Sequence, residues 1–397
     1  MIVVSLLLGF LAVVLLLPTL SDLLSLARLA IRNGARSRAT PDAQPRFLFL
    51  IPAHDEELLL PACLVSVRRQ RYPASRIDAV VVADNCRDRT AELAAAAGVQ
   101  CLIRTAPADP GKPQAIAWAL AQLPVVDYDA VVIVDADTEV DAEFAACLAT
   151  RAPIANKVLQ PYNGLSNGRE NALTRMAAVL SEANHGLAYV LKTRAGLNVP
   201  LSVGMCLGSG VLAKHGWTVH TLSEDWEMYA LLTARGVRIE EVPGARIRAQ
   251  EAATLRASGT QRRRWTAGKL NVLGEHAGSL LRSRAIGPAQ KLDVLGELSA
   301  SGPALHLCLA IAGAGAAALL RPPGFQLLAI LLLTSLARPM LYTLLALSKD
   351  REPFRALGAF VVLPFYAVWR LWVAITSLST LTSRIWVRTE RHRSAAP

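Results

Sequence analysis

Hydrophobic residues follow two different patterns along the chain. Residues 2–17 form an almost unbroken apolar run, and residues 298–320 and 325–347 form two more near the other end. Each of the latter two is long enough to cross the hydrocarbon core of a bilayer, which is about 30 Å thick. Between Pro45 and Gly287 the apolar residues come in short groups separated by polar ones. The pattern therefore predicts a soluble domain flanked by membrane segments.

Within this domain, segments with strand-like and helix-like patterns alternate. Short apolar runs predict strands, and stretches with helical periodicity lie between them. The predicted strands are residues 47–51, 79–83, 99–104 and 130–134, and the predicted helices are residues 56–70, 90–97 and 113–123. This alternation is typical of an α/β domain with a mostly parallel sheet. In such sheets, ligands bind beyond the carboxyl ends of the strands.

The charges beside the first apolar run predict its orientation. No basic residue precedes the run, and the arginines that follow it are Arg28, Arg32, Arg36, Arg38 and Arg46. We interpret residues 1–31 as an uncleaved transmembrane anchor that leaves the domain on the cytoplasmic side of the cell membrane. Residues 268–297 contain further basic residues and are predicted to form amphipathic helices that lie on the membrane surface.

Residues 298–381 are predicted to hold a transmembrane hairpin and a third apolar segment. Pro364 and Arg370 interrupt that third segment, and a basic tail, residues 382–397, follows it. If the segment crossed the membrane, the tail would lie outside, against the rule that basic flanks stay in the cytoplasm. We therefore favour a re-entrant or interfacial segment, and the expected number of spans is three or four.

Composition and charge narrow the class of protein. Hydrophobic residues make up 53% of the 397 and charged residues only 18%, against roughly a quarter charged in soluble proteins. This balance excludes a disordered or fibrous chain. The net charge of +11 suits anionic lipid headgroups or phosphorylated ligands. No nucleic-acid-reading motif is present, and the six cysteines have no zinc-binding spacing.

The polar segments after the predicted strands carry the candidate chemistry. They are Pro52–Glu57, Asp84–Thr90, Gly111–Gln114 and Asp135–Asp137. No GxGxxG follows the first strand and no P-loop occurs, so a different kind of nucleotide site is required. Asp135 and Asp137 offer hard oxygen ligands that suit Mg²⁺ or Mn²⁺ bound to a diphosphate. Taken singly, either aspartate could instead cap a helix.

Six motifs in order make the pattern specific. They are PAHDEE, ADNCRDRT, GKPQA, VDADTEVD, SEDWE and QRRRW, spread from Pro52 to Trp265. In this order they resemble the membrane-bound branch of glycosyltransferase family 2, which includes cellulose synthase-like and exopolysaccharide-type enzymes. The resemblance implies a GT-A fold, Rossmann-like and mostly parallel, over residues 45–267. It also implies metal-dependent, inverting transfer from a nucleoside-diphosphate sugar, usually a UDP-sugar.

The resemblance also implies roles for individual residues. Those expected to hold the base and ribose of the donor are Pro52, Ala53, His54, Glu56 and Asp84. Lys112 would meet the donor phosphates, and Asp135 and Asp137 would bind the sugar diphosphate and its metal. Asp225 matches the general base, and Glu224 is assigned to the acceptor side. Alternatively, Ser223, Glu224 and Asp225 could simply start a helix that Gly236 ends, and both interpretations can hold together.

The QRRRW motif and a glycine-rich segment complete the predicted site. Gln261, Arg264 and Trp265 fall on one face of a helix, and the resemblance assigns the first two to the donor diphosphate and Trp265 to the acceptor. We expect Arg262 and Arg263 to meet anionic lipid headgroups instead. Gly208, within Met205–Gly210, is expected to let the backbone approach an acceptor sugar, with a simple turn as the alternative.

The sequence leaves the acceptor open between two main alternatives. One is a polysaccharide or lipid-linked oligosaccharide at the cell surface, and the other is a free lipid, ceramide-like or hopanoid-like. No FxVTxK-like gating segment follows the QRRRW motif, which argues against a channel that exports the product. An inactive sugar-nucleotide-binding scaffold is a third, weaker alternative, because the expected catalytic residues are all present.

Overall fold

The structure is a computed structural model that describes residues 1–31, 43–221 and 223–377. Among these residues the chain forms two compact units. We call residues 43–167 and 198–251 the sheet unit, and residues 1–31, 168–197 and 252–377 the helical unit. Arg32, Arg36 and Arg38, which follow the anchor, and the basic tail, residues 382–397, lie outside the described residues.

The sheet unit contains eight strands and the helices between them. Its strands are β1 (Phe47–Ala53), β2 (Ile77–Asp84), β3 (Gln100–Arg104), β4 (Ala130–Ile133), β5 (Thr138–Val140), β6 (Val158–Leu165), β7 (Cys206–Gly208) and β8 (Ile239–Ala249). Its α-helices are α2 (Leu60–Arg68), α3 (Thr90–Ala96), α4 (Lys112–Leu120), α5 (Phe144–Ala149), α8 (Ser209–His215) and α9 (Glu224–Ala234). Short 3₁₀ turns cover Ala74–Arg76 and Val125–Asp127.

The strands form one mixed sheet in the order β3-β2-β1-β4-β7-β6-β8-β5. The first four are parallel to one another. β7 runs antiparallel to both β4 and β6, and β8 is parallel to β6 but antiparallel to β5. The α/β domain with a mostly parallel sheet that the sequence predicts is therefore confirmed. The carboxyl ends of β1, β2 and β4 lie at the same edge, as parallel pairing requires.

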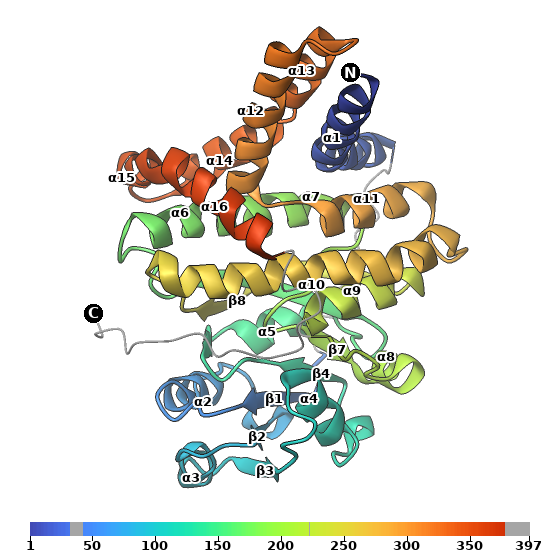
Figure 1. Cartoon of the computed structure of the whole chain (residues 1–397). Coiled ribbons are helices and arrows are strands. Elements are labelled where there is room, and N and C mark those ends of the chain that lie inside the picture. Colours follow the sequence, from blue (N-terminus) through green and yellow to red (C-terminus); the bar gives the residue numbers. More distant parts are fainter. Residues whose placement is uncertain (32–42, 222, 378–397) are drawn as a thin grey trace. The chain divides into compact units, whose positions relative to one another are not determined.

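One apolar core cluster of the sheet unit lies against one face of β1, a strand that is buried on both faces. Phe47, Phe49 and Ile51 alternate along the strand and are fully buried, because side chains two apart in a strand share a face. Leu64 of α2 and Phe144 of α5 belong to the same cluster, and the rings of Phe49 and Phe144 lie 6.0 Å apart. These contacts hold α2 and α5 against the sheet whose strand ends carry the candidate site (Figure 1).

One helix start and one helix cap differ from expectation. The predicted helix 56–70 begins only at Leu60, because Asp55 has a positive φ of 54° and the backbone N–H groups of Glu56 and Glu57 donate to side chains of another loop. Helix α9 begins after Ser223, as predicted, but the Ser223 side chain makes no capping hydrogen bond.

The helical unit is formed by the two ends of the chain and a middle segment. Its elements are α1 (Ile2–Ile31), α6 (Ala172–Ser181), a π-helical segment (Glu182–Ala188), α7 (Tyr189–Ala195), α10 (Leu255–Arg282), α11 (Pro288–Ser299), α12 (Pro303–Leu320), α13 (Phe325–Thr334), α14 (Ala337–Lys349), α15 (Pro353–Gly358), a 3₁₀ segment (Ala359–Val362) and α16 (Leu363–Ser377). Residues 168–197 and 252–267, assigned from sequence to the sugar-transfer domain, group here with the apolar helices.

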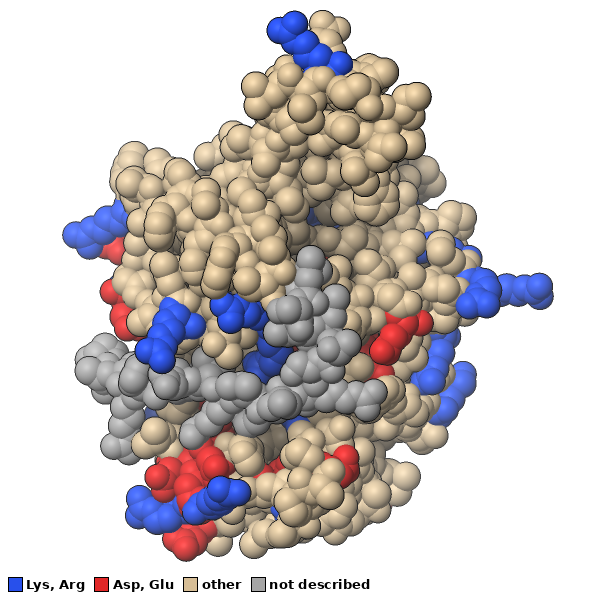
Figure 2. Space-filling model, viewed as in Figure 1, with Lys and Arg blue, Asp and Glu red and all other residues tan. Residues whose placement is uncertain are grey.

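Four helical stretches among the described residues are long and apolar enough to cross a membrane. They are Ile2–Ile31, Pro303–Leu320, Phe325–Lys349 and Pro353–Ser377. The last is the segment for which the sequence favours a re-entrant or interfacial path. Its length and hydropathy permit either that path or a full membrane span. Figure 2 shows that the visible surface of the α12–α13 hairpin is uncharged except at its tip. Exposed apolar side chains such as Ile311, Leu327 and Ile330 cover this hairpin, as expected of helices that face lipid.

Candidate active site

The end of β2 is organised around a buried ion pair. The Asp84 carboxylate lies 2.7 Å from Nη1 of Arg104, and both side chains are almost fully buried. Arg104 also pairs with Asp109 at 2.7 Å. The other oxygen of Asp84 accepts the backbone N–H of Gly111 at 3.4 Å. Asp84 therefore positions the loop that leads into α4, a contact the sequence does not reveal because Arg104 stands outside every recognised motif.

Lys112 joins two carboxylates that are far apart in the sequence. Gly111, with φ of 135°, turns the chain so that α4 starts at Lys112. The lysine Nζ lies 2.6 Å from Asp135, which follows β4, and 2.6 Å from Glu224, in the first turn of α9. Burial opposes the lysine charge, but these two carboxylates raise the pKa of Lys112 above its ordinary value. The lysine therefore stays protonated.

Asp225 lies beside this cluster at the start of α9. Burial, with repulsion from Glu224, raises the pKa of Asp225 to about 7, although Lys112 and the backbone N–H of Trp226 act in the opposite direction. That N–H donates to Asp225 at 2.8 Å. A carboxylate with a pKa near neutrality is suited to accept a proton, because general bases work best when their pKa lies near the working pH.

The residues after β4 have the chemistry of a divalent cation site. Asp135 and Asp137 are separated by the buried Ala136, and Thr138 donates to the Asp137 carboxylate at 3.2 Å. Carboxylates outnumber the single lysine in this cluster, so it carries excess negative charge. Hard oxygen ligands and a negative surplus fit Mg²⁺ or Mn²⁺, which Asp135 and Asp137 would hold.

The predicted base-binding residues lie on and after β1. Pro52 and Ala53 are the last residues of that strand. His54 follows, and its Nδ1 lies 2.7 Å from the carbonyl oxygen of Asp84. The backbone N–H of Glu56 donates to Oγ1 of Thr90 at 2.8 Å. The structure thus brings the loops after β1 and β2 together, as the sequence predicts for neighbouring parallel strands.

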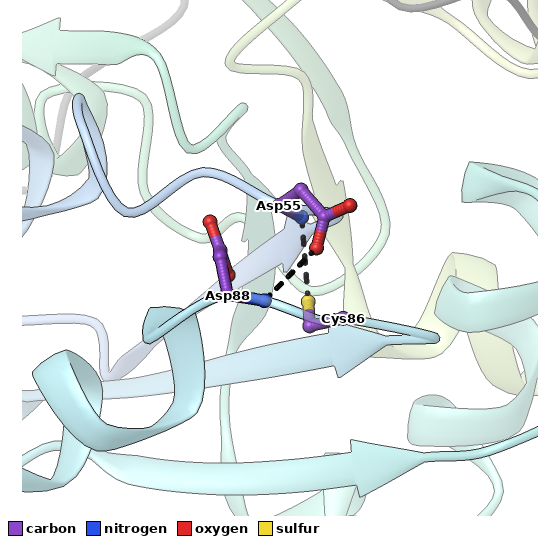
Figure 3. Close-up of side chains that lie close together, drawn as sticks. All are labelled: Asp55, Cys86 and Asp88. Atoms are coloured by element: carbon purple, nitrogen blue, oxygen red, sulfur yellow. Dashed lines mark hydrogen bonds between the residues drawn. The ribbon is translucent and has the colours of Figure 1, made fainter.

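Three further side chains, which the sequence analysis did not single out, brace these two loops (Figure 3). Asp55 accepts the backbone N–H of Arg87 at 2.7 Å, and Asp88 accepts that of Glu57 at 2.9 Å. The N–H of Asp55 in turn donates to Sγ of Cys86 at 3.4 Å. The potential ligand atoms of Asp55, Cys86 and Asp88 lie within 4.8 Å of one another. Because both carboxylates accept backbone N–H groups, we interpret the group as a brace between the loops.

Gly208 has a structural reason to be glycine that differs from the expected one. It ends β7, which places it in a strand rather than a turn. A Cβ atom on Gly208 would lie 2.2 Å from the carbonyl oxygen of Ala155 and 2.3 Å from that of Ile154. The close approach that requires glycine is therefore to the protein's own backbone.

Replacing Gly208 with alanine should lower the free energy of unfolding of the sheet unit by about 1–3 kcal/mol, the usual cost of overpacking. Amide hydrogen exchange in β6 and β4 would measure the loss. Gly287→Ala is the matched control, because nothing lies within 4 Å of a Cβ at Gly287. Equal protection of the β4 and β6 amides from hydrogen exchange in the two variants would contradict the prediction.

The QRRRW motif lies within α10 of the helical unit, so the predicted helical spacing of Gln261, Arg264 and Trp265 is present. Gln261 is buried, whereas Trp265 is 41% exposed. The guanidinium carbon of Arg262 lies 5.2 Å from the centre of the Trp265 ring. An exposed indole with a stacked arginine offers a flat surface to a ligand.

Comparison with known proteins yields two curated relatives. A probable glycosyltransferase of Bacillus subtilis strain 168, YdaM, is 25% identical over 258 residues, which make up 61% of this chain and 59% of that protein. Glucomannan 4-beta-mannosyltransferase 7 of Arabidopsis thaliana is 24% identical over 259 residues, 61% of this chain and 46% of that protein. The chain thus spans about half the length of these relatives.

A solved structure shares the fold. It is the mannosyltransferase PcManGT from Pyrobaculum calidifontis, in complex with GDP-Man and Mn²⁺, with a TM-score of 0.59 and 16% identity over 95% of this chain and 99% of that one. The family model described as "Glycosyltransferase like family 2" matches residues 45–268. That match covers more than half of the chain, and the sheet unit it includes has the GT-A architecture. The protein belongs to glycosyltransferase family 2.

Proposed function

We propose that this protein transfers a sugar, with inversion, from a nucleoside-diphosphate sugar to an acceptor at a membrane surface. The observation that carries the proposal is the cluster of Asp225, Glu224, Lys112 and Asp135, where a carboxylate with a raised pKa adjoins a paired lysine and a potential metal ligand. The family match and the names of the relatives support the reaction class.

The reaction is a single displacement in which Asp225 acts as general base. Its carboxylate accepts the proton of an acceptor hydroxyl while that oxygen attacks the anomeric carbon from the face opposite the leaving group. The bond from this carbon to the diphosphate oxygen breaks, and its electron pair leaves with the nucleoside diphosphate. Removing the proton during attack contributes about 10²- to 10⁴-fold to such a rate.

The leaving diphosphate requires positive charge. Asp135 and Asp137 would hold Mg²⁺ or Mn²⁺, which when bound supplies charge neutralisation to the phosphate oxygens. Lys112 contributes a fixed cation in the same cluster, and Arg264 and Gln261 are proposed to add hydrogen-bond donors. Glu224 would hold Lys112 in place and lie toward the acceptor, and Trp265 would stack on an acceptor sugar. Gly208 remains a proposed acceptor contact, in addition to its own packing.

The nucleoside is proposed to lie over the carboxyl ends of β1 and β2. Pro52, Ala53 and His54 would flank the base, and Asp84 would use its more weakly engaged oxygen for the base or ribose. Glu56 is held next to Thr90 and would complete this side of the site. Uridine is the expected nucleoside by resemblance to the membrane-bound branch of the family.

The acceptor is proposed to be membrane-associated, either a growing cell-surface polysaccharide or a lipid-linked oligosaccharide. The four apolar helical stretches support membrane placement, with the sheet unit expected in the cytoplasm. The name of the glucomannan mannosyltransferase supports a polysaccharide product. Product sizing after incubating membranes with labelled UDP- and GDP-sugars is the decisive experiment. A ladder of polymers would support polysaccharide synthesis, a single glycosylated lipid would favour glycolipid synthesis, and no transfer from any donor would refute the proposal.

Chelation should silence the enzyme. We expect EDTA to lower turnover by at least about 10²-fold, because a bound cation supplies several kcal/mol to the leaving group. Excess Mn²⁺ or Mg²⁺ should restore the rate in the same sample, which controls for denaturation. Full activity after exhaustive chelation would contradict the metal role of Asp135 and Asp137.

Activity should fall in mild acid. Asp225 must be deprotonated to act as base, and its raised pKa of about 7 keeps it protonated below that pH. We therefore expect kcat/KM to drop about tenfold per unit below pH 7. A pH profile measures this, with the residual rate of Asp225→Asn as the reference that should lack the step. An acidic limb near pH 4, the ordinary value for aspartate, would contradict the assignment.

A further inference from the structure

A buried arginine in the helical unit has no counter-charge among the described residues. Arg370, on α16, is only 7% exposed, and its Nη1 atom makes no hydrogen bond within the part of the chain that the structure describes. No described carboxylate forms an ion pair with it. Arginine side chains are rarely buried unless they are paired, and a buried donor without an acceptor calls for a ligand or ion.

The helix that packs against α16 adds more positive charge to the same place. α10 crosses α16 (Figure 1), and Arg262 of α10 is the charged side chain that repels Arg370. The guanidinium carbon of Arg263, also on α10, lies 5.3 Å from the ring centre of Trp372 on α16. The Nε atom of Arg263 is buried and makes no hydrogen bond to any described residue. Guanidinium groups from two helices thus face one interface.

The surroundings of these arginines are aromatic and apolar. Tyr366 and Trp369 of α16 stack with ring centres 5.3 Å apart. Gly259 of α10 faces this ring pair, since a Cβ there would lie 3.4 Å from the Trp369 ring. Phe365 and Val368 on α16 are exposed, and the helix belongs to a stretch apolar enough to span a membrane. A ligand that fits this interface has an anionic head and an apolar body.

We propose that Arg370, Arg262 and Arg263 bind the phosphate group of a membrane lipid between α10 and α16. The planar guanidinium offers paired N–H donors that match two phosphate oxygens, and tyrosine and tryptophan favour the depth at which lipid headgroups lie. The inference rests on the proposed membrane placement of these helices but not on sugar transfer, because the lipid binds without a donor.

The test is equilibrium binding of labelled oleyl phosphate to the full chain in neutral detergent. Arg370→Gln should weaken binding at least tenfold, which corresponds to 1.4 kcal/mol, and Arg263→Gln several-fold. Arg355→Gln is the matched control and should change affinity less than about twofold, since that arginine is exposed and pairs with Glu352. The affinity of Arg370→Lys, which keeps the charge, should lie between those of the unmodified chain and Arg370→Gln. Arg370→Lys replaces Arg370→Gln if the latter does not fold.

Three comparisons can overturn the proposal. Oleyl alcohol should bind far more weakly than oleyl phosphate, and equal binding would remove the phosphate from the site. Inorganic phosphate alone should bind more weakly too, and equal affinity would make the site one for soluble anions. UDP affinity should not change in Arg370→Gln, and a parallel loss would assign the arginine to the sugar donor. If the unmodified chain binds oleyl phosphate but transfers no sugar, the proposed function is refuted and the lipid site is not.

Discussion

Replacing Asp225 with asparagine should lower kcat by about 10²- to 10⁴-fold and leave the affinity for the nucleotide sugar nearly unchanged. Asparagine has almost the same shape and can still accept the N–H of Trp226 through its amide oxygen, so the first turn of α9 should persist. It cannot take a proton from an acceptor hydroxyl. The loss should therefore appear in the chemical step and not in binding.

Initial rates with labelled donor, together with calorimetric titration of UDP, would separate these two quantities. Asp127→Asn is the matched control, because Asp127 is exposed in the 3₁₀ turn before β4 and lies outside the cluster. Glu224→Gln offers a second comparison, since it should disturb Lys112 and weaken donor binding as well as turnover. Near-normal turnover of Asp225→Asn would eliminate this residue as the base.

Replacing Arg104 with methionine should destabilise the sheet unit by about 3–5 kcal/mol, because Asp84 would be left as a buried charge without a partner. Methionine fills a similar volume, so packing loss contributes little. Amide hydrogen exchange of β2 and β3 in the full chain would report the change in free energy of unfolding. The same variant should weaken UDP binding, since Asp84 holds the backbone of Gly111 at the start of α4.

Asp109→Asn provides the control for this prediction. It removes the second ion-pair partner of Arg104. The Asp109 side chain is 66% exposed, and exposed ion pairs contribute at most about 1 kcal/mol to the free energy of unfolding. The double variant Arg104→Met with Asp84→Asn should recover part of the lost stability, because the buried negative charge is gone. Equal destabilisation by Arg104→Met and Asp109→Asn would contradict the prediction that losing the buried pair costs more stability than losing the exposed one.

The sequence predicts the first four strands well because each is a short apolar run that ends at a polar loop. The bounds of β1, β2, β3 and β4 all lie within two residues of the predicted ones. Their parallel pairing then brings the loops after β1 and β2 together without further information. The local signals were weaker at α2, where Glu56 and Glu57 suit a helix but their N–H groups are taken by the neighbouring loop.

The contacts that define the cluster could not be predicted in the same way. Lys112 and Glu224 are 112 positions apart, and only the tertiary fold brings α4 and α9 together. Arg104 is the last residue of β3, and its local sequence pattern does not indicate that it pairs with Asp84. Residues 168–197 group with the apolar helices, although their mixed composition resembles that of a soluble domain.

The place of β7 in the sheet has a consequence for how the chain folds during synthesis. β7 joins β4 to β6, and Leu207 is the register partner of both Val131 and Val158. Residues 168–197, which belong to the helical unit, must leave the ribosome before this joining strand does. Until then β4 has an unpaired edge, and open strand edges recruit other chains. The length of this inserted segment therefore sets the interval in which the nascent protein exposes the edge of β4 and can aggregate.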